Sequence, residues 1–413
     1  MATIRWAGTA PAVAQVSTAQ VTAYDVATTY KLTIGNKVVS VIAQGSINLT
    51  AAGLATAWNA LSATQYPEHS EVTASSATDT VTLTADVAGR PFTCTSSVSG
   101  GAGTIGAVAT GTASAGPNHW DTAANWSGNA VPVGADTVHI EDSSVSILYG
   151  LDQNSTTLTA LNIAANYTGQ IGLPQRNQGG YDEYRTTHLT ISSTNVRIGY
   201  GPGAGSGRIK LNTLTVLATV DVDRTGTTVE PGVPSLCWKG THASGVVNVN
   251  RGYVGIGFFG LDSATVLTLR VGMRDSKLTD ADVICGAGCT LTTANQLGGK
   301  LEVNSNLTTA NIRGGIFTFR MAATLTTLDM GAYDAEKNKD ARAVCYYNSS
   351  GTLTTANVRW GGTLDFSQDQ RAKTVTTLNA FRGASIINPA QVAAVTLAPA
   401  GGATPGDFSY NPG

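Results

Sequence analysis

Charged residues are scarce in this sequence. They make up 13% of its 413 residues, which is about half the share found in ordinary soluble proteins. The 25 Lys and Arg residues nearly balance the 27 Asp and Glu residues, so the net charge is −2. Proteins that bind nucleic acids need clustered positive charge to neutralise phosphates. The composition therefore gives no reason to expect DNA or RNA as a partner.

Cysteine and histidine are also sparse. The sequence has five cysteines, an odd number that does not suggest a disulfide framework. Cys285 and Cys289 lie close together, but no second pair and no neighbouring His accompanies them. We interpret them as buried small residues rather than metal ligands. The histidines are scattered without metal-ligand spacing, so we expect neither a metal site nor any other cofactor site.

Long hydrophobic runs are missing as well. No apolar segment approaches the length that crosses a bilayer, and residues 1–6 (Met-Ala-Thr-Ile-Arg-Trp) lack the apolar core of a secretion signal. We therefore expect a soluble protein that is made in a cytoplasm and has no membrane partner.

What the sequence does contain is glycine (47 residues), Thr and Val, with a strand-sized phrase that recurs near the C-terminus. Each copy reads apolar-Thr-Thr-apolar-Asn or Asp. The copies begin at Leu291, Leu307, Leu325, Leu353 and Val375. Most are followed by a Gly turn and a second short strand. A repeated strand–turn–strand unit cannot bury its apolar face alone, so neighbouring copies must stack.

The spacing between copies varies, which favours a β-solenoid over a propeller or a helical repeat. In a solenoid, extra residues leave the coil as a loop, and the charged segment 333–342 is typical of such an insertion. The sequence thus predicts a mainly β protein with a parallel β-helix or β-solenoid body at 151–398. The five apolar starts should lie in register in one sheet.

A polar residue ends each copy of the phrase. We interpret these residues as turn residues that bond the backbone at a corner. The alternative is an ordered ladder in which Asn of one coil bonds Asn of the next. The positions concerned are Asn295, Asn311, Asp329, Asn357 and Asn379.

The N-terminal part has a different pattern. After an extended arm at 1–20, alternating residues around Gly35-Asn36 predict a hairpin. Thr50 is the expected cap of a helix that runs to about Ser62, with Leu54 and Trp58 on its buried face. Further strands follow, so residues 21–99 are predicted to form a β-β-α-β-β domain.

Five short phrases mark this domain: Tyr30-x-Leu-x-Ile, Ala57-Trp-Asn-Ala, Val72-Thr-Ala, Val81-Thr-Leu-Thr-Ala and Ala88-Gly-Arg-Pro-Phe. In this order they resemble a small α+β domain that recurs in tailed-phage virion proteins. The resemblance covers about a fifth of the chain. That family implies assembly and docking and supplies no active-site residues.

A Gly/Ala-rich linker is predicted at 100–117, followed by a Trp-rich cap of the solenoid at 118–150. The segment with Trp120 and Trp126 resembles the opening of β-helical surface and phage proteins. A sugar-stacking platform is the alternative for these two rings. The Pro/Gly-rich residues 399–413 are predicted to form an extended tail.

Two segments invite a chemical interpretation. The run 199–207 is rich in Gly, but it lacks the Gly-Lys-Ser/Thr ending of a phosphate loop, so a turning loop is favoured. The segment 181–185 (Tyr-Asp-Glu-Tyr-Arg), with His188, is the densest polar cluster. We interpret it as a salt-bridged loop at a subunit contact. Asp182 and Glu183 should point to opposite faces of a strand, so a glycosidase pair would need an acid from elsewhere.

Asp221, Asp223 or Asp262, from another coil, could supply that further acid, but no pattern in the sequence singles one out. No Ser-His-Asp or Cys-His arrangement can be assigned, so we name no catalytic residue and expect no enzyme activity. The resemblance predicts a bacteriophage structural protein that is made in the host cytoplasm and carried on the virion. A capsid decoration or head-spike protein leads, forming a homotrimer on the major capsid protein. The alternatives are a tail fibre or tailspike that binds a host-surface glycan, and a polysaccharide depolymerase.

Overall fold

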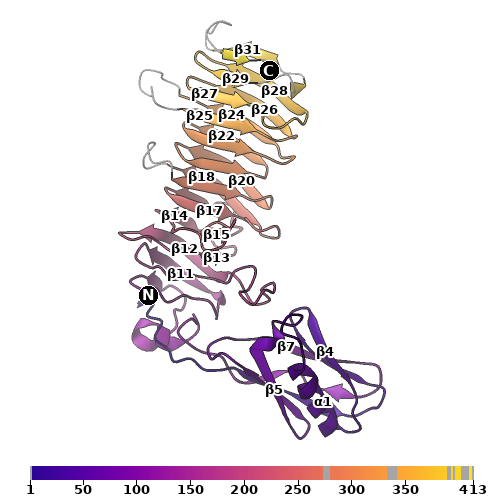
Figure 1. Cartoon of the computed structure of the whole chain (residues 1–413). Coiled ribbons are helices and arrows are strands. Elements are labelled where there is room, and N and C mark those ends of the chain that lie inside the picture. The colour runs from indigo at the N-terminus through magenta and orange to yellow at the C-terminus, as the bar shows by residue number, and fades with distance from the viewer. Residues whose placement is uncertain are drawn as a thin grey trace.

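The computed structural model describes residues 2–272, 280–332 and 342–387, together with the backbone of 392–393, 396–400 and 409–411. Nearly all of the predicted insertion at 333–342 and most of the tail at 399–413 lie outside these residues. Figure 1 presents a small domain beside the foot of a long rod, with the N-terminus at the foot. The predicted class is confirmed: the chain is mainly β, with a small α+β region and a parallel β-solenoid.

The small domain consists of two antiparallel sheets and one helix. One sheet has the order β5-β6-β2-β8, with β9 also pairing with β2, and the other has the order β4-β3-β7. The helix α1 contacts β4 and β5. The elements are β2 (Val16–Ala23), β3 (Thr29–Ile34), β4 (Lys37–Ile42), α1 (Ile47–Asn59), β5 (Val72–Ala77), β6 (Thr80–Ala85), β7 (Cys94–Ser99), β8 (Thr104–Ile105) and β9 (Ala109–Thr112).

The helix begins earlier than its sequence pattern suggests. Ser46 is the N-cap, and its side chain accepts a hydrogen bond from the Leu49 amide. Thr50, the expected cap, lies inside the first turn, where its hydroxyl donates to the Ser46 carbonyl. The predicted apolar face is confirmed, because Leu54 and Trp58 are buried.

Strand pairing moves the domain boundaries away from those predicted. Residues 104–105 and 109–112, in the expected linker, form β8 and β9 on the edge of β2. In the expected N-terminal arm, β1 (Thr3–Arg5) pairs in parallel with β10 (Thr137–Ile140) of the rod. The chain therefore starts in the rod, leaves to build the small domain, and returns, so two segments join the two parts.

A cluster of tryptophans closes the foot of the rod. Trp6 and Trp120 both pack edge-on against Trp126, with ring centroids 4.9 and 4.6 Å away. All three rings are buried, with at most 4% of each residue exposed. The predicted cap position is therefore occupied, and the sugar-stacking alternative is excluded because no ring face is open to a ligand. Trp6 comes from the segment expected to be an extended arm.

The rod is built from two parallel ladders of strands, both of which begin at the long strands β11 (Asp152–Ala164) and β12 (Leu189–Tyr200). Beyond them, successive strands alternate between the ladders. The first ladder continues with β14 (Thr219–Val222), β16 (Val246–Val249), β18 (Ala264–Val271), β20 (Cys289–Gln296), β22 (Leu307–Ile312), β24 (Leu325–Met330), β26 (Thr352–Val358), β28 (Lys373–Ala380), β30 (Val392–Ala393) and β31 (Thr396–Pro399). The second consists of β13 (Ile209–Asn212), β15 (Leu236–Lys239), β17 (Gly252–Ile256), β19 (Ala281–Cys285), β21 (Lys300–Val303), β23 (Gly315–Phe319), β25 (Ala343–Tyr347), β27 (Gly362–Asp365), β29 (Ser385–Ile387) and β32 (Ser409–Asn411).

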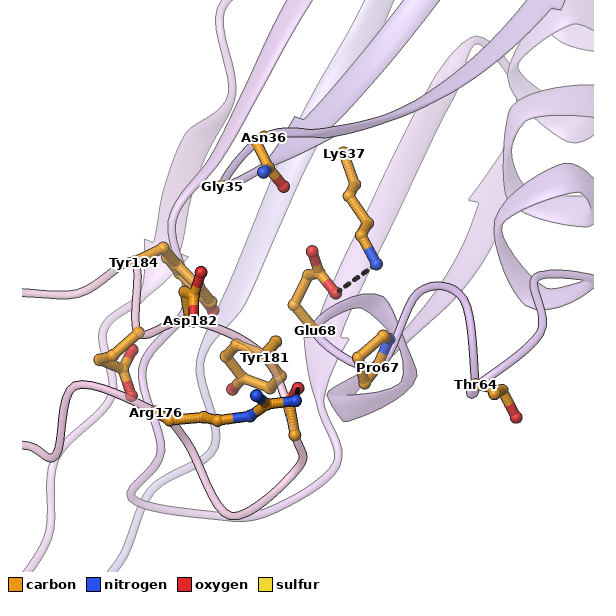
Figure 2. Close-up of a pocket in the computed structure, with 12 residues that line it drawn as sticks. Gly35, Asn36, Lys37, Thr64, Pro67, Glu68, Arg176, Tyr181, Asp182 and Tyr184 are labelled. Carbon is orange, nitrogen blue, oxygen red and sulfur yellow. Dashed lines mark hydrogen bonds and ion pairs between the residues drawn. The ribbon is translucent and has the colours of Figure 1, made fainter. Parts of the chain in front are cut away.

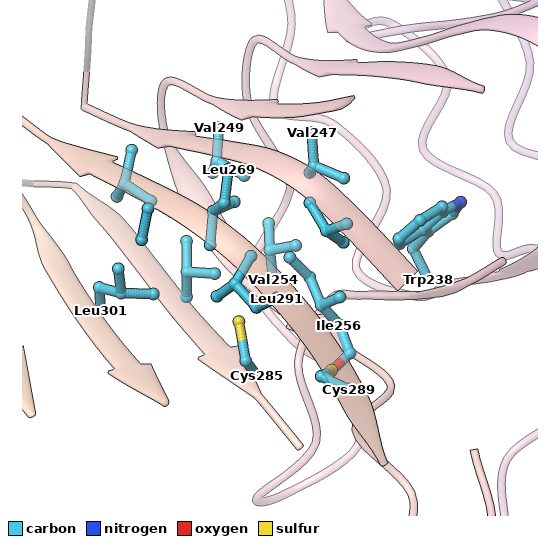
Figure 3. Close-up of a cluster of buried hydrophobic side chains, with 14 of the residues drawn as sticks. Trp238, Val247, Val249, Val254, Ile256, Leu269, Cys285, Cys289, Leu291 and Leu301 are labelled. Atoms are coloured by element: carbon cyan, nitrogen blue, oxygen red, sulfur yellow. The ribbon is translucent and has the colours of Figure 1, made fainter. Parts of the chain in front are cut away.

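The recurring phrase lies in register along the first ladder, as predicted. Leu291 pairs with Leu307, Leu307 with Leu325, Leu325 with Leu353, and Leu353 with Val375. All five are buried. Figure 3 shows how side chains of the two ladders meet in the core, among them Leu291 and Cys285. The cysteines are free and buried, as expected.

The polar residue that ends each phrase lies within a strand, so the interpretation as a turn residue is wrong. The Asn311 amide donates to Asn295 at 2.9 Å, and the Asn379 amide donates to Asn357 at 2.8 Å. Asp329, between these pairs in the register, accepts from Arg359. Parallel in-register stacking places like residues above one another, which makes the ladder the favoured use of an amide.

Removing one amide from this ladder should have a modest effect. We expect Asn311→Ala to lower the free energy of unfolding by about 1 kcal/mol, the usual net contribution of a hydrogen bond. Thr308→Ala, at an exposed position of the same strand, is the control and should change little. Denaturant unfolding measures both. Equal stability of the two variants would mean that the ladder contributes nothing.

Candidate functional site at the junction of the two domains

The polar cluster predicted at 181–185 lies in a loop between β11 and β12 that reaches the small domain. The loop closes on itself: the Asn177 amide donates to the Tyr181 carbonyl, and Arg176 and Asp182 form an antiparallel bridge. The loop therefore presents its side chains from a folded backbone. The contact it makes is between two parts of one chain.

Arg185 is the centre of the contact. Its guanidinium donates to Glu183 at 2.7 Å, to the Tyr181 hydroxyl at 2.7 Å and to the Pro91 carbonyl at 3.0 Å. The Tyr181 hydroxyl in turn donates to Glu71 of the small domain at 2.9 Å. Arg90 completes this junction network with an ion pair to Glu71 at 2.9 Å. The network comprises Glu71, Arg90, Tyr181, Glu183 and Arg185.

Burial makes these interactions strong. The Glu183 side chain is fully buried and that of Arg185 is 7% exposed. Burial raises the pKa of Glu183, but the hydrogen bonds and charge of Arg185 outweigh it and hold the pKa below its usual range. Burial raises the pKa of Tyr181, so its hydroxyl stays protonated and available as a donor. The junction network therefore joins the loop to the small domain through the bonds of Tyr181 to Glu71 and of Arg185 to the Pro91 carbonyl.

The predicted acids do not come together as a catalytic pair. Both Asp182 and Glu183 line a cleft, but the Glu183 carboxylate is bonded by Arg185. Asp221 accepts from Asn248 at 2.7 Å, and Asp223 pairs with Arg197 at 3.0 Å. Both acids are therefore engaged by side chains of the rod.

His188 and Asp262 belong to a second cluster, over the outer face of the second ladder. Asp262 pairs with Lys239 at 2.6 Å, and its other oxygen lies 3.8 Å from His188. Burial, Lys239 and Lys210 lower the pKa of His188 to about 4, against the charge of Asp262. Lys210, itself buried, pairs with Glu230 at 3.1 Å. Sequence reasoning missed Lys210, whose alternation with Ile209 and Leu211 was the available signal.

A cleft of about 490 Å³ opens beside the junction network (Figure 2). The small domain contributes Lys37 and Glu68, whose charged groups are 3.6 Å apart, and the loop contributes Arg176, Asp182 and Tyr184. Glu68 is almost fully buried. This lining can hold a small polar molecule by hydrogen bonds, and Lys37 and Glu68 pair with each other across it.

A second cleft of about 330 Å³ lies against Tyr149 and Arg185. The Gly-rich segment 199–207 leads directly into strand β13, so the phosphate-loop alternative fails for want of a helix. Within the described residues, no group of three His, Cys, Asp or Glu side chains is arranged to hold a metal ion. In the same residues, no helix is both long enough and apolar enough to span a membrane.

No protein-family model matches the sequence, and searches of curated proteins and of solved structures find no match for it. The class of protein is defined by the fold and the junction alone. It is a β-solenoid protein whose first coils contact a small α+β domain.

His69, two residues before Glu71, makes the small domain sensitive to acid. It is 1% exposed, packs 4.5 Å from the Trp58 ring, and neither ring nitrogen has a hydrogen-bond partner. Burial lowers its pKa to about 4, against the charge of Glu68. Above pH 6.5 the ring is neutral in both folded and unfolded chains, so stability is full. Between pH 6.5 and 4 only the unfolded chain takes up the proton, so stability falls with pH.

The loss from His69 should reach roughly 3 kcal/mol at pH 4. His69→Phe should remove most of the difference between thermal melts at pH 7 and pH 4.5 for the small domain. His242→Phe, at a partly exposed position, is the control. The small domain must be followed separately, because His188 also makes the rod sensitive to acid. Unchanged pH dependence in His69→Phe would contradict the assignment.

Proposed function

We propose that this chain is a structural component of a bacteriophage virion, with the role of a capsid decoration or head-spike protein. The observation that carries the proposal is the junction network, which fixes a small domain at the foot of a rod. One part can then bind a surface while the other projects at a defined angle. The resemblance of the small domain to those of tailed-phage virion proteins is the second support.

The geometry suits display better than catalysis. Two connecting segments, together with the bonds from Tyr181 to Glu71 and from Arg185 to the Pro91 carbonyl, resist movement of the domain against the rod. The rod itself has a continuous apolar core and polar ladders outside. We propose that the protein is made in the host cytoplasm and assembles as a homotrimer on the major capsid protein.

The test is the number of copies per particle, measured by quantitative mass spectrometry of purified virions. Copies in the hundreds indicate a decoration protein, and a few to a few dozen indicate a spike or fibre. Absence of the chain from purified particles would refute a virion role.

A receptor-binding tail fibre or tailspike is the second candidate. The polar cleft beside Lys37, Arg176 and Asp182 favours it, because such groups can bond the hydroxyls of a host-surface glycan. A glycan array probed with the full chain tests it, with Arg176→Met as the variant that should lose any signal.

A polysaccharide depolymerase is less favoured, because Glu183 is engaged by Arg185, and Glu68, which lines the same cleft as Asp182, is paired with Lys37. We expect the purified chain to release no reducing ends or unsaturated sugars from host capsule. Release that is abolished by Asp182→Asn would overturn this expectation.

A further inference from the structure

Strand β4 is the outer strand of its sheet, and its backbone groups alternate in direction. The Ala43 amide donates to the Thr28 carbonyl at 3.0 Å. Because bonded pairs alternate in an antiparallel ladder, Val39 and Val41 direct their backbone groups toward β3. Val38, Ser40 and Ile42 must therefore direct theirs away from the sheet.

The corresponding edge of the other sheet is covered. On β5, the Trp58 indole donates to the Val72 carbonyl at 2.7 Å. The Asn59 amide donates to the Ala74 carbonyl at 2.7 Å, and its oxygen accepts from the Ala74 amide at 3.0 Å. Helix side chains thus take the place of a neighbouring strand.

The first strand of the rod is covered too. The Arg5 amide donates to the Ser127 hydroxyl at 2.9 Å, and the Ala7 amide to the Asn125 carbonyl at 2.7 Å. Exposed edges invite pairing with other chains, so proteins normally block them in such ways.

Nothing comparable protects β4 within the described residues. One side-chain bond reaches its outward groups, from the Gln44 amide to the Ile42 carbonyl at 3.1 Å. The same residues also carry exposed apolar side chains: Val38 is 43% exposed and Ile42 is 63% exposed. An open edge that is also apolar is the pattern of a surface built to accept a strand.

The outer face of this sheet has a simple charge pattern. The register of β3, β4 and β7 shows which residues share this face. They are all Thr or Ser, except Val38, Ile42 and Lys31. Lys31 lies directly beside Ser40. A second copy that paired through its own β4 would offer no acidic residue, because β4 contains none, whereas an acidic residue opposite Ser40 would complement Lys31.

We propose that β4 docks the small domain by accepting an extended strand of a partner protein, with apolar residues opposite Val38 and Ile42 and an acidic residue opposite Ser40. This rests on the proposed function, in which the partner is a protein of the virion shell. The docked strand would extend the sheet β4-β3-β7 and bond the outward groups of β4.

Proline at Ser40 is the selective variant. Proline is tolerated on an edge strand where its missing amide would face outward, and it blocks the addition of a strand there. Ser40→Pro should therefore melt near the wild-type temperature. Val39→Pro, one residue away, removes a bond to β3 and should lower the melting temperature clearly. If the two effects are reversed, the assignment of the open edge is wrong.

Binding is measured with the full chain and two probes. One probe is purified particles assembled without this protein. The other is a capped synthetic strand peptide of alternating Thr and Val with a central Glu. Ser40→Pro and Ile42→Lys should each weaken binding about tenfold or more, because each removes hydrogen bonds or apolar contact along the strand. Val87→Lys, at an apolar residue 49% exposed in a loop outside β4, is the matched control.

The outcomes separate the two proposals. Particle binding that survives both β4 variants overturns the docking edge and leaves the virion role standing. Peptide binding that depends on β4 without any particle binding supports the edge and refutes the virion role. No binding to either probe refutes the edge. A dimer of the wild-type chain that Ser40→Pro converts to monomer in light scattering assigns the edge to a second copy and overturns the foreign partner.

Discussion

Leu307→Asp should destabilise the rod by about 4 kcal/mol or more, because it buries an unpaired charge between coils. Leu307 is 2% exposed and lies in register between Leu291 and Leu325. Each coil of a solenoid contacts mainly its neighbours, so the damage should be local. We expect hydrogen exchange to rise in β20, β22 and β24 while the small domain keeps its protection.

Thr308→Asp is the control for that experiment, since Thr308 is the next residue and is exposed. Its free energy of unfolding should lie within about 0.5 kcal/mol of the wild-type value, as is usual for surface substitutions. Leu353→Asp, two coils further on, should repeat the large effect with exchange centred on β26. Wild-type stability of Leu307→Asp would mean that the position does not face the core.

Arg185→Met should destabilise the loop that carries the junction by about 3–5 kcal/mol, the usual effect of removing one partner of a buried ion pair, and so weaken its contact with the small domain. The fully buried Glu183 would lose its counter-charge, and Tyr181 would lose a donor. The pKa of Glu183 should then rise, since burial would act without its opponent. The loss relative to wild type should therefore shrink as the pH falls and Glu183 becomes protonated.

Limited proteolysis of the connecting segments and thermal melts at two pH values measure this effect. Arg176→Met is the control, because Arg176 belongs to the same loop and its guanidinium donates to the Gly180 carbonyl of that loop. Adding Glu183→Gln to Arg185→Met should recover part of the stability by removing the buried charge. If Arg185→Met behaves like Arg176→Met, the junction network does not hold the domains together.

The rod was predictable from sequence because its physics repeats. Parallel stacking in register needs equivalent residues at equivalent places. The coils are therefore visible in the sequence as a repeat, which begins at Leu291, Leu307 and Leu325. The ladder of Asn311 on Asn295 was visible as the same repeat, but a single copy of Asn equally suits a turn. Only the stacking partner, which the sequence does not name, decides between them.

The junction could be predicted only in half. Tyr181 and Arg185 formed a visible cluster, but their partner Glu71 lies 110 positions from Tyr181, in another domain. The strands β8 and β9 were missed for a related reason. Their Gly, Ala and Thr composition is that of a linker, and their strand character comes from pairing with β2 far away in sequence. Local patterns do not record such pairings.

The entry of the chain into the rod before the small domain has a mechanical consequence. A domain on a single tether can swivel about its bonds, so a pull on it aligns the tether and a twist is not passed on. Here Thr3 pairs with Thr137 in the first sheet of the rod. Two connecting segments therefore lead from the small domain into the capped foot of the rod. Force applied to the domain divides between two covalent paths, and torque applied to it turns the rod.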